Sequence, residues 1–324
     1  MAKEIKTIGV LTSGGDAPGM NAAVRAVVRT ALSKGIKVKG IERGYNGLLH
    51  NEMRDMDLRS VSEIIHRGGT VLYTARCLEF LTKEGQEQGA QCCRDNGIDA
   101  LVVVGGDGSF KGARALANLG IPCIGIPGTI DNDIACSEYT IGYDTAMNTA
   151  VEMVDKLRDT TQSHDRCSVV EVMGRHAGYI ALNVGIATGA IATLIPERPY
   201  DLERDILDRM SFTQKTGKKH FIVVVAEGVG GVEDIAKKIE EETGIESRAT
   251  VLGHVQRGGN PTVRDRVMAT EMGYAAVKLL KDGIGNRVIG WKKGDIVNYD
   301  IYEALNMKKP FDDEMYEIAH TTSI

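Results

Sequence analysis

The chain has 324 residues, of which 43% are hydrophobic and 26% are charged, and its formal net charge is −5. These values are typical of a soluble globular protein with one large or two smaller domains. The charge is not concentrated in a basic block, so we expect no nucleic-acid partner. The six cysteines include no C-x-x-C pair, which favours reduced thiols and a cytoplasmic protein. The longest aliphatic runs are strand-sized, so we expect no signal peptide and no membrane partner.

Short apolar runs alternate with helical patterns along almost the whole chain. We predict strands at 7–12, 36–41, 99–104, 122–126, 167–173, 192–195, 221–226 and 249–253. We predict helices at 18–34, 83–96, 110–119, 144–160, 177–187, 202–215, 232–243 and 262–281. Apolar strands separated by helices indicate an α/β fold of doubly wound, mainly parallel sheets covered by helices. Ligands bind such sheets beyond the carboxyl ends of the strands, so the turns there deserve the closest reading.

The turn "GGDGS" at 105–109 joins a predicted strand to a predicted helix. Glycine lets the backbone approach a ligand closely, and a helix start offers free N–H groups, so this turn predicts a phosphate site. Asp107 would be repelled by phosphates unless Mg²⁺ lay between them. A tight turn in which Asp107 only caps the helix is the alternative. The spacing of the glycines matches neither the dinucleotide fingerprint nor the P-loop.

The turn "TIDND" at 129–133 places Asp131 and Asp133 directly after the next predicted strand. Phosphoryl transfer to an alcohol needs a base for the hydroxyl proton, with a metal and cations to stabilise charge. Two aspartates beside a phosphate site fit that need. Simple turn chemistry explains the same residues equally well on local grounds, because Asp and Asn favour turns.

Two later turns carry an arginine just after a predicted strand. They are "VMGRHAG" at 172–178, with Arg175, and "GHVQRGGNP" at 253–261, with His254 and Arg257. A guanidinium group can bind phosphate through two hydrogen bonds. Glu227, after "FIVVVA", adds a carboxylate that could accept substrate hydroxyls. Any one of these residues alone would more often be an ordinary surface residue, but their recurrence at strand ends favours an active site.

The set of turns resembles the bacterial ATP-dependent 6-phosphofructokinase family over essentially the whole chain. The resemblance rests on "GVLTSGGDAPGMNA", "GGDGS", "PGTIDND", "RDTTQSHDR", "VEVMGRHAG", "AEG" and "TVLGHVQRGG" in family order. It implies phosphorylation of fructose 6-phosphate at its 1-hydroxyl by ATP, giving fructose 1,6-bisphosphate and ADP, the committed step of glycolysis. It also implies a homotetramer of two-domain subunits with the active site in the cleft between the domains. Residues 1–141 plus 256–306 would bind ATP, and 142–255 plus 307–324 would bind fructose 6-phosphate.

The resemblance also assigns roles to individual residues. Asp131 would be the base, and Thr129 and Arg175 would stabilise the transferring phosphoryl group. ATP would be bound by Gly15, Arg76, Cys77, Gly106, Asp107, Gly108 and Ser109, with Asp107 on Mg²⁺. The sugar phosphate would be bound by Thr129, Ile130, Asp131, Met173, Gly174, Arg175, Glu227, His254, Val255, Gln256 and Arg257. Arg166 and Arg248 would reach it from a neighbouring subunit.

Two further positions concern the phosphoryl donor. Pyrophosphate-dependent members of the family typically carry Asp at the position of Gly108 and Lys at that of Gly128. Both residues are glycine in this chain. A carboxylate at 108 would crowd and repel the inner phosphate of a nucleotide, so we expect ATP as the donor.

A regulatory site is less well matched than the catalytic one. An effector site between subunits would use Arg25, Arg29, Arg158, Gly189, Lys218 and His220. Arg25 and Arg29 are four residues apart and share one helix face. However, Ile191, Thr216 and Leu58 stand where the family usually has Glu, a lysine and an arginine, and Tyr179 replaces an aspartate. We therefore expect weak or absent activation by ADP, since Ile191 cannot coordinate a metal, while control by phosphoenolpyruvate stays open.

Two other classes of protein remain as alternatives. NAD kinases and diacylglycerol kinases share "GGDG", but they do not predict "PGTIDND" or the later arginine turns. A nucleotide sensor without enzymatic activity is a second alternative, although Asp107, Asp131 and Arg175 are all present.

Overall fold

The structure is a computed structural model that describes residues 4–323. Its chain divides into two compact units. Unit 1 is the chain up to Thr145 together with Arg257–Lys309, and unit 2 is Ala146–Gln256 together with the chain from Pro310 onward. The boundaries predicted from the sequence fall after residues 141, 255 and 306. Which unit binds ATP and which binds the sugar phosphate stays a prediction.

Unit 1 is built on a seven-stranded sheet. Its strands are β1 (Thr7–Thr12), β2 (Lys37–Ile41), β3 (Met53–Met56), β4 (Ala100–Gly105), β5 (Cys123–Pro127), β10 (Arg287–Lys292) and β11 (Asp295–Asp300). Their order across the sheet is β11-β10-β5-β4-β1-β2-β3. The outermost strands β3 and β11 are antiparallel to their neighbours, and all other pairs are parallel.

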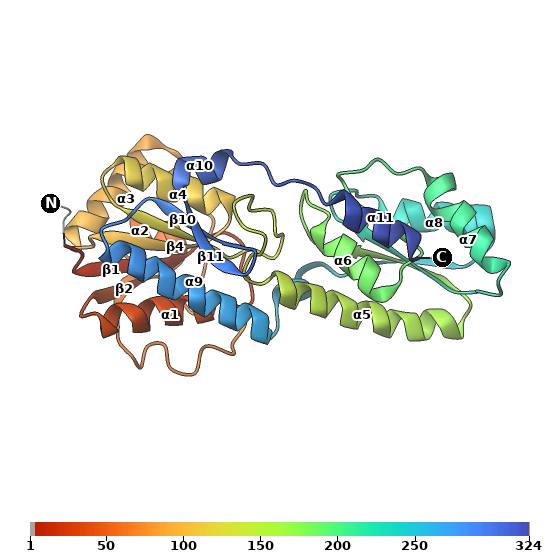
Figure 1. Ribbon diagram of the computed structural model, residues 1–324, viewed down its shortest axis with the longest axis horizontal. Coiled ribbons are helices and arrows are strands. Elements are labelled where there is room, and N and C mark those ends of the chain that lie inside the picture. The colour runs from red at the N-terminus through yellow and green to blue at the C-terminus, as the bar shows by residue number, and fades with distance from the viewer. Residues whose placement is uncertain (1–3, 324) are drawn as a thin grey trace. The chain divides into compact units, whose positions relative to one another are not determined.

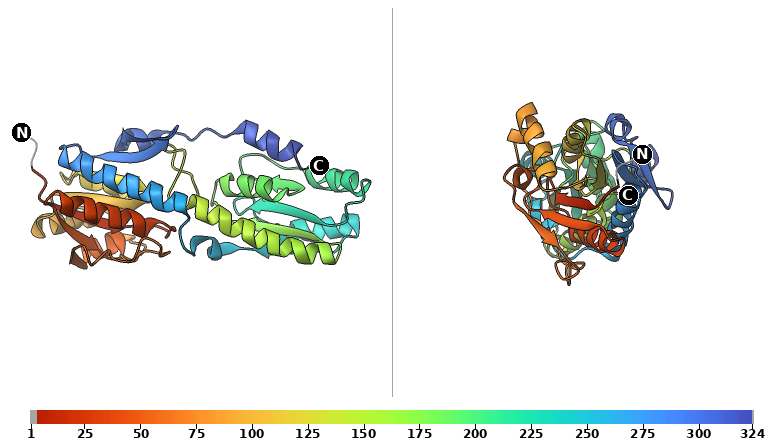
Figure 2. Two further views of the ribbon diagram at one scale, coloured as in Figure 1. Left: turned by 60° about the horizontal axis from the view of Figure 1, so that its bottom comes forward. Right: turned by 90° about the vertical axis from the view of Figure 1, so that its left-hand side faces the viewer.

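Helices cover both faces of this sheet. They are α1 (Met20–Ser33), α2 (Gly44–Leu49), the 3₁₀ turn η1 (Glu79–Leu81), α3 (Lys83–Asp95), α4 (Asp107–Asn118), α9 (Val263–Lys281) and α10 (Ile301–Asn306). Helices α1 and α9 lie side by side on one face (Figures 1 and 2). Leu101 and Val103 of β4 point to the opposite face, where they join the core beneath α3 and α4. Because both faces are covered, both sets of alternating side chains are buried, and β4 is a continuous apolar run.

Unit 2 contains a smaller, fully parallel sheet. Its strands are β6 (Cys167–Val172), β7 (Ala192–Leu194), β8 (Phe221–Ala226) and β9 (Ser247–Val251), in the order β7-β8-β6-β9. Its helical elements are α5 (Tyr143–Ser163), which starts in unit 1, α6 (Tyr179–Thr188), the π-helical turn η2 (Glu203–Leu207), α7 (Asp208–Gln214), α8 (Val232–Thr243), the 3₁₀ turn η3 (Gly253–Arg257), which ends in unit 1, and α11 (Asp313–Thr321). One face of the sheet packs its core against α7 and α8.

All eight predicted strands and all eight predicted helical segments are present; β1, β8 and α8 have the predicted ends, and the ends of the others are shifted. The largest correction in type is at 202–215, where a π-helical turn precedes α7. The prediction missed β3, β10, β11, α2, α10 and α11. Within residues 4–323, no helix has the length and apolar character needed to cross a membrane.

Candidate active site

Three glycine-rich turns of unit 1 meet at one edge of its sheet. They follow β1, β4 and β5, which are parallel neighbours. The backbone N–H of Ser13 donates to the carbonyl of Val104 at 2.9 Å, and that of Gly128 donates to Gly105 at 3.0 Å. These bonds link each turn to the next one. The sheet therefore brings together residues that lie more than a hundred positions apart in the sequence.

The turn after β4 presents the start of α4, whose first helical residue is Asp107. The first N–H groups of a helix have no partner within it, so this end can bind an anion. Ser109 is buried, and its hydroxyl donates to the carbonyl of Ser13 at 3.0 Å. The Ser109 side chain therefore fixes the turn after β1. Gly108 is exposed, so it is the backbone of this turn that is available to a phosphate.

The Asp107 side chain offers a single carboxylate at the start of α4. It is 47% exposed, and one of its oxygens lies 2.6 Å from the ammonium group of Lys111, one helical turn later. The described residues contain no group of three or more His, Cys, Asp or Glu side chains that could hold a metal. A lone carboxylate fits Mg²⁺ that takes its other ligands from phosphate oxygens and water. It does not fit a metal site built by the protein alone.

The turn after β5 carries the predicted base. Thr129 and Asp131 are 8% and 6% exposed, and the N–H of Asp131 donates to the Thr129 hydroxyl at 3.2 Å. Ile130 between them is fully buried, so this residue offers a ligand no exposed surface in this structure. Asn132 has a positive φ of 51°, which is an uncommon backbone conformation for a residue other than glycine. The turn is therefore compact and needs contacts from elsewhere to hold it.

Arg257 contacts the turn after β1. Its Nη1 donates to the carbonyl of Asp16 at 3.1 Å, and a Cβ on Gly15 would lie 2.5 Å from the same nitrogen. The Thr74 hydroxyl donates to the carbonyl of Gly14 at 2.7 Å, which ties the segment before Arg76 and Cys77 to this turn. The structure thus brings the predicted ATP residue Gly15 and the predicted sugar-phosphate residue Arg257 into contact.

Arg76 and Cys77 differ in their surroundings. Arg76 is exposed, whereas Cys77 is half-buried and packs against the core beneath α3 and α4. Within that core, the rings of Tyr45 and Phe80 stack with their centroids 4.2 Å apart. The Tyr45 hydroxyl donates to the carbonyl of Ser109 at 2.6 Å, so this aromatic pair supports the turn after β4 from below.

In unit 2 a second group of predicted residues gathers where β8, β6 and β9 end. The N–H of Arg175 donates to the Glu227 carboxylate, and the N–H of Met173 donates to Oε1 of Gln256 at 3.2 Å. A Cβ on Gly174 would lie 2.3 Å from the carbonyl of Ala177, so this tight turn requires glycine. The side chains of Arg175, His254 and Val255 are exposed, while Gln256 is buried and shapes the turn.

Arg166 and Arg248 lie at the other edge of the same sheet. Arg166 precedes β6, and Arg248 pairs with Ser168 near the start of β9. Both guanidinium groups bind Glu246, through Nε of Arg166 at 2.7 Å and through Nε and Nη2 of Arg248 at 2.9 and 2.6 Å. These hydrogen bonds, with that of Arg166 first, hold the pKa of Glu246 below its usual range. A strand of six residues spans roughly 20 Å, so these arginines are distant from Arg175 and Glu227 of the same chain.

The effector residues predicted in unit 2 form a cluster of positive charges. Burial lowers the pKa of His220, and the charges of Lys218 and Arg158 lower it further, while Asp165 opposes the shift. Arg158 donates to the carbonyl of Thr188, next to Gly189, which ends α6 with a φ of 58°. Ile191 is fully buried in the core. Its side chain offers no ligand to a metal.

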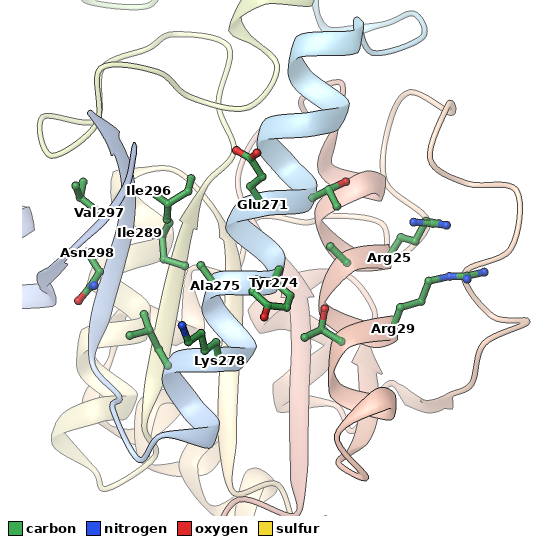
Figure 3. Close-up of a pocket in the computed structure, with 14 residues that line it drawn as sticks. Arg25, Arg29, Glu271, Tyr274, Ala275, Lys278, Ile289, Ile296, Val297 and Asn298 are labelled. Carbon is green, nitrogen blue, oxygen red and sulfur yellow. The ribbon is translucent and has the colours of Figure 1, made fainter. Parts of the chain in front are cut away.

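The effector residues predicted in unit 1 lie on α1. Arg25 and Arg29 extend from α1 on the side away from α9, while Tyr274 and Lys278 of α9 line the same cavity of about 610 Å³ (Figure 3). Burial lowers the pKa of Arg25, and the neighbouring charge of Arg29 adds to this, while Glu63 opposes it. The two side chains therefore lie near each other on one face of α1.

Two residues at this edge of unit 1 were missed by reasoning from the sequence. Lys309 donates from Nζ to the carbonyl of Asn132 at 2.5 Å and to that of Ser137 at 3.0 Å. Asp265 is fully buried and accepts from the N–H of Gly142 at 2.7 Å and of Thr145 at 2.9 Å. Asp265 follows Thr262 by three residues in a helix-start pattern, which was a usable signal. Lys309 carries no local signal, because its partner is 177 residues away.

Comparisons with known proteins agree with this geometry. The sequence profile of the phosphofructokinase family matches residues 7–280. A Clostridium botulinum (strain Loch Maree) protein named ATP-dependent 6-phosphofructokinase is 56% identical over 315 residues, covering 97% of this chain and 98% of the relative. A Clostridioides difficile protein of the same name is 55% identical over 320 residues, covering 99% of this chain and all of the relative.

Solved structures give the same result. Phosphofructokinase from Saccharomyces cerevisiae superposes with a TM-score of 0.93 and 35% identity, covering 98% of this chain and 50% of that one. A pyrophosphate-dependent phosphofructokinase from Marinobacter aquaeolei has a TM-score of 0.84 at 24% identity, covering 99% of this chain and 92% of that one. The second likeness concerns the fold alone. Together with the match of the family profile, the full-length identity shows that the chain belongs to the phosphofructokinase family.

Proposed function

We propose that the protein transfers the terminal phosphoryl group of ATP to the 1-hydroxyl of fructose 6-phosphate, giving fructose 1,6-bisphosphate and ADP. The observation that carries this function is the position of Asp131. It lies in a buried turn joined by the Gly128–Gly105 hydrogen bond to the turn that starts α4. A carboxylate beside an anion-binding helix start is the arrangement that phosphoryl transfer to an alcohol needs. Such a glycolytic enzyme would work in the cytoplasm.

Asp131 would act as the general base. A base must lie within hydrogen-bond reach of the proton that it removes, and its position must be fixed. The N–H of Asp131 is bound to the Thr129 hydroxyl, which restricts the backbone at this point. Most of the catalytic gain in phosphoryl transfer comes from positioning and from electrostatic stabilisation of charge. Thr129 and Arg175 would contribute to that stabilisation.

Mg²⁺ would be held at Asp107 together with the phosphates of ATP. The ion supplies charge neutralisation on the phosphate oxygens when it is bound. The half-exposed Asp107 carboxylate and the start of α4 suit this role. Gly15, Gly106, Gly108 and the backbone of Ser109 would bind the nucleotide phosphates, and Arg76 and Cys77 would contact the rest of the nucleotide.

Unit 2 would bind the sugar phosphate with the residues at the carboxyl edge of its sheet. Glu227 already accepts a backbone hydrogen bond from Arg175, so the two residues are positioned together. A carboxylate accepts sugar hydroxyls, and exposed guanidinium and imidazole groups bind phosphate. Met173, Gly174, His254 and Val255 would complete this surface, with Gln256 supporting it and Arg257 contributing from unit 1.

Arg166 and Arg248 would serve a neighbouring subunit. They lie at the amino edge of the sheet, whereas Arg175 and Glu227 follow the carboxyl ends of its strands. One sugar phosphate cannot reach both edges of the same sheet. A homotetramer in which these arginines complete the site of another copy resolves the difference, and each active site would then require two chains.

Regulation by ADP would be weak. Arg25, Arg29, Arg158 and Lys218 would supply positive charge for a phosphate group, and His220, whose pKa is lowered by burial and by Lys218 and Arg158, would donate a hydrogen bond. ADP usually binds together with a metal ion, and that ion would need a carboxylate at position 191. Ile191 supplies none, and its side chain is buried in the core of unit 2. Saturation curves for fructose 6-phosphate should shift less than about twofold on adding ADP, because an effective allosteric coupling of ~1–3 kcal/mol gives 5- to 150-fold. A several-fold leftward shift that Arg25→Ala abolishes would contradict this inference.

A coupled assay tests the proposed function. The purified protein should form fructose 1,6-bisphosphate from fructose 6-phosphate and Mg·ATP, and should show little activity when pyrophosphate replaces ATP. Removal of Mg²⁺ with a chelator should abolish turnover. Efficient turnover with pyrophosphate would show that the donor is wrong, and phosphorylation of NAD or a lipid would show that the acceptor is wrong.

A further inference from the structure

We propose that Lys309 is a positioning residue for Asp131, which it holds in place through the backbone of the turn that carries the base. The proposal rests on the proposed function, since it concerns the base of that reaction. Lys309 is the last residue of unit 1. It lies on the segment that leads from α10 to α11 (Figure 1).

The contacts of Lys309 close the turn at two points. Its ammonium group donates to the carbonyl of Asn132, the residue after Asp131, at 2.5 Å and to the carbonyl of Ser137 at 3.0 Å. The two carbonyls are five residues apart in the sequence, so a single side chain links the start of the loop to its middle. A charged donor makes stronger hydrogen bonds to a carbonyl than a neutral one does.

The turn needs such support because its backbone is in an uncommon conformation. Asn132 has a φ of 51°. A residue other than glycine keeps such a backbone conformation when contacts with the surrounding structure hold it there. Asn132 also donates from its side chain to the carbonyl of Glu138 at 3.2 Å, and the Thr140 hydroxyl donates to the carbonyl of Thr129 at 2.6 Å. Lys309 adds a contact to the carbonyl of Asn132, the residue that directly follows the base.

The position of the segment means that this support comes from far along the chain. The carbonyl of Asn132 and the amine of Lys309 are 177 residues apart. Lys308, the neighbouring residue, is exposed. It is a matched control because it carries the same charge and lies on the same non-helical segment. The pair separates the effect of the contact from the effect of one positive charge on this segment.

The experiment compares Lys309→Met, Lys309→Arg and Lys308→Met with the unchanged protein, with full kinetics and hydrogen exchange. Lys309→Met keeps the apolar stem and removes the charged donor. It should lower kcat by about 10- to 100-fold, the scale for a displaced catalytic group, with both KM values within about twofold. Lys309→Arg should recover most of kcat because it retains a charged donor. Lys308→Met should have the kcat of the unchanged protein.

Hydrogen exchange gives a readout that does not depend on activity. Amides in 129–137 should exchange at least about tenfold faster in Lys309→Met than in Lys308→Met, while those of β4 keep their rates. Unchanged kcat in folded Lys309→Met, or unchanged exchange of this turn, would overturn the proposal. So would a loss of kcat in Lys309→Met that Lys308→Met shares. If the unchanged protein failed to phosphorylate fructose 6-phosphate, the proposed function would fall, and exchange would still decide whether Lys309 holds the turn.

Discussion

Gly108 and Gly128 stand at the same edge of the seven-stranded sheet, but a side chain would meet different surroundings at the two positions. A Cβ on Gly108 would meet no protein atom within 4 Å. A Cβ on Gly128 would lie 3.0 Å from Val104 Cγ1 and 3.3 Å from Met20 Cε. Packing therefore explains Gly128 without any ligand. Packing does not explain Gly108, and the open space there fits the proposed binding of nucleotide phosphates at this turn.

Replacing Gly108 should separate folding from nucleotide use. Gly108→Asp should unfold at the same temperature as the unchanged protein, within a few degrees, because the space is open. It should lower kcat/KM for ATP at least about tenfold, which is 1.36 kcal/mol of transition-state stabilisation. A carboxylate there would repel the phosphates. The measurement is steady-state kinetics with ATP varied and fructose 6-phosphate held at saturation.

Gly108→Ala is the matched control for this variant. It adds a methyl group without charge, so it should lose less kcat/KM for ATP than Gly108→Asp does. Equal activity of Gly108→Asp and the unchanged protein with ATP would contradict the placement of phosphates at this turn.

Lys309, on the segment from α10 to α11, is expected to make activity depend on pH. Burial lowers the pKa of Lys309 to about 8, and Asp133, Cys136 and Glu138, which face its amine, act in the opposite direction. Below pH 8 the amine is charged and donates strongly to the carbonyl of Asn132. Above pH 8 it is neutral and a weaker donor. The free energy of unfolding should instead rise with pH over this range. Between pH 8 and about 10.4, the ordinary pKa of lysine, this side chain binds more protons in the unfolded chain than in the folded one.

The kcat of the unchanged protein should therefore fall as the pH rises above about 8, without a loss of stability from this group. In Lys309→Arg this fall of kcat should begin at a higher pH or be absent, because the guanidinium group remains charged. Both profiles are measured at saturating substrates, with thermal unfolding recorded at each pH. If kcat fell over the same alkaline pH range in both proteins, Lys309 would not titrate in the way described.

Elements differed in how well the sequence predicted them, and the reason is burial. β4 and β8 are buried along their full length and read as unbroken apolar runs. β3 and β11 are outer strands with exposed and half-buried residues, so their sequences alternate poorly. α2 contains two glycines in six residues, which lowers its intrinsic helix propensity. These elements form because neighbouring strands and helices supply the packing.

The same distinction applies to the site. Gly105 and Asp131 were predictable as neighbours because β4 and β5 end at one edge of the sheet in unit 1, and Arg175 and Glu227 because β6 and β8 end at one edge of the sheet in unit 2. The contacts that individual side chains make were not predictable. Ser109, for example, binds the turn after β1, and Arg257 packs on Gly15. Lys309 could not be found at all from the sequence, because nothing near it in the chain indicates a partner at Asn132. Contacts between distant segments are decided by the folded backbone.

The whole molecule is expected to function as an oligomer, because Arg166 and Arg248 lie at the amino edge of the sheet in unit 2. Arg248→Ala should raise the KM for fructose 6-phosphate and leave that for ATP nearly unchanged. Mixed oligomers of Arg248→Ala and Asp131→Asn chains should recover activity at sites that combine the intact halves, in a symmetric assembly roughly a quarter of the sites. The assay requires chains that have been unfolded, mixed and refolded together.

The control for complementation is the same pair of variants refolded separately and then mixed. Native mass spectrometry would confirm that both chains are present in one oligomer. Recovery below a few per cent in verified mixed oligomers would show that each chain completes its own site, and the role of Arg166 and Arg248 would have to be sought elsewhere.

The most direct test of the central claim is the kcat of Asp131→Asn with fructose 6-phosphate and Mg·ATP. Asn is nearly isosteric and cannot accept a proton, so kcat should fall by about 10²–10⁴, the range for loss of a general base. Both KM values should change little, because the lost interaction operates in the transition state. A kcat near that of the unchanged protein, in a variant that folds and binds both substrates, would contradict the assignment of Asp131 as the base.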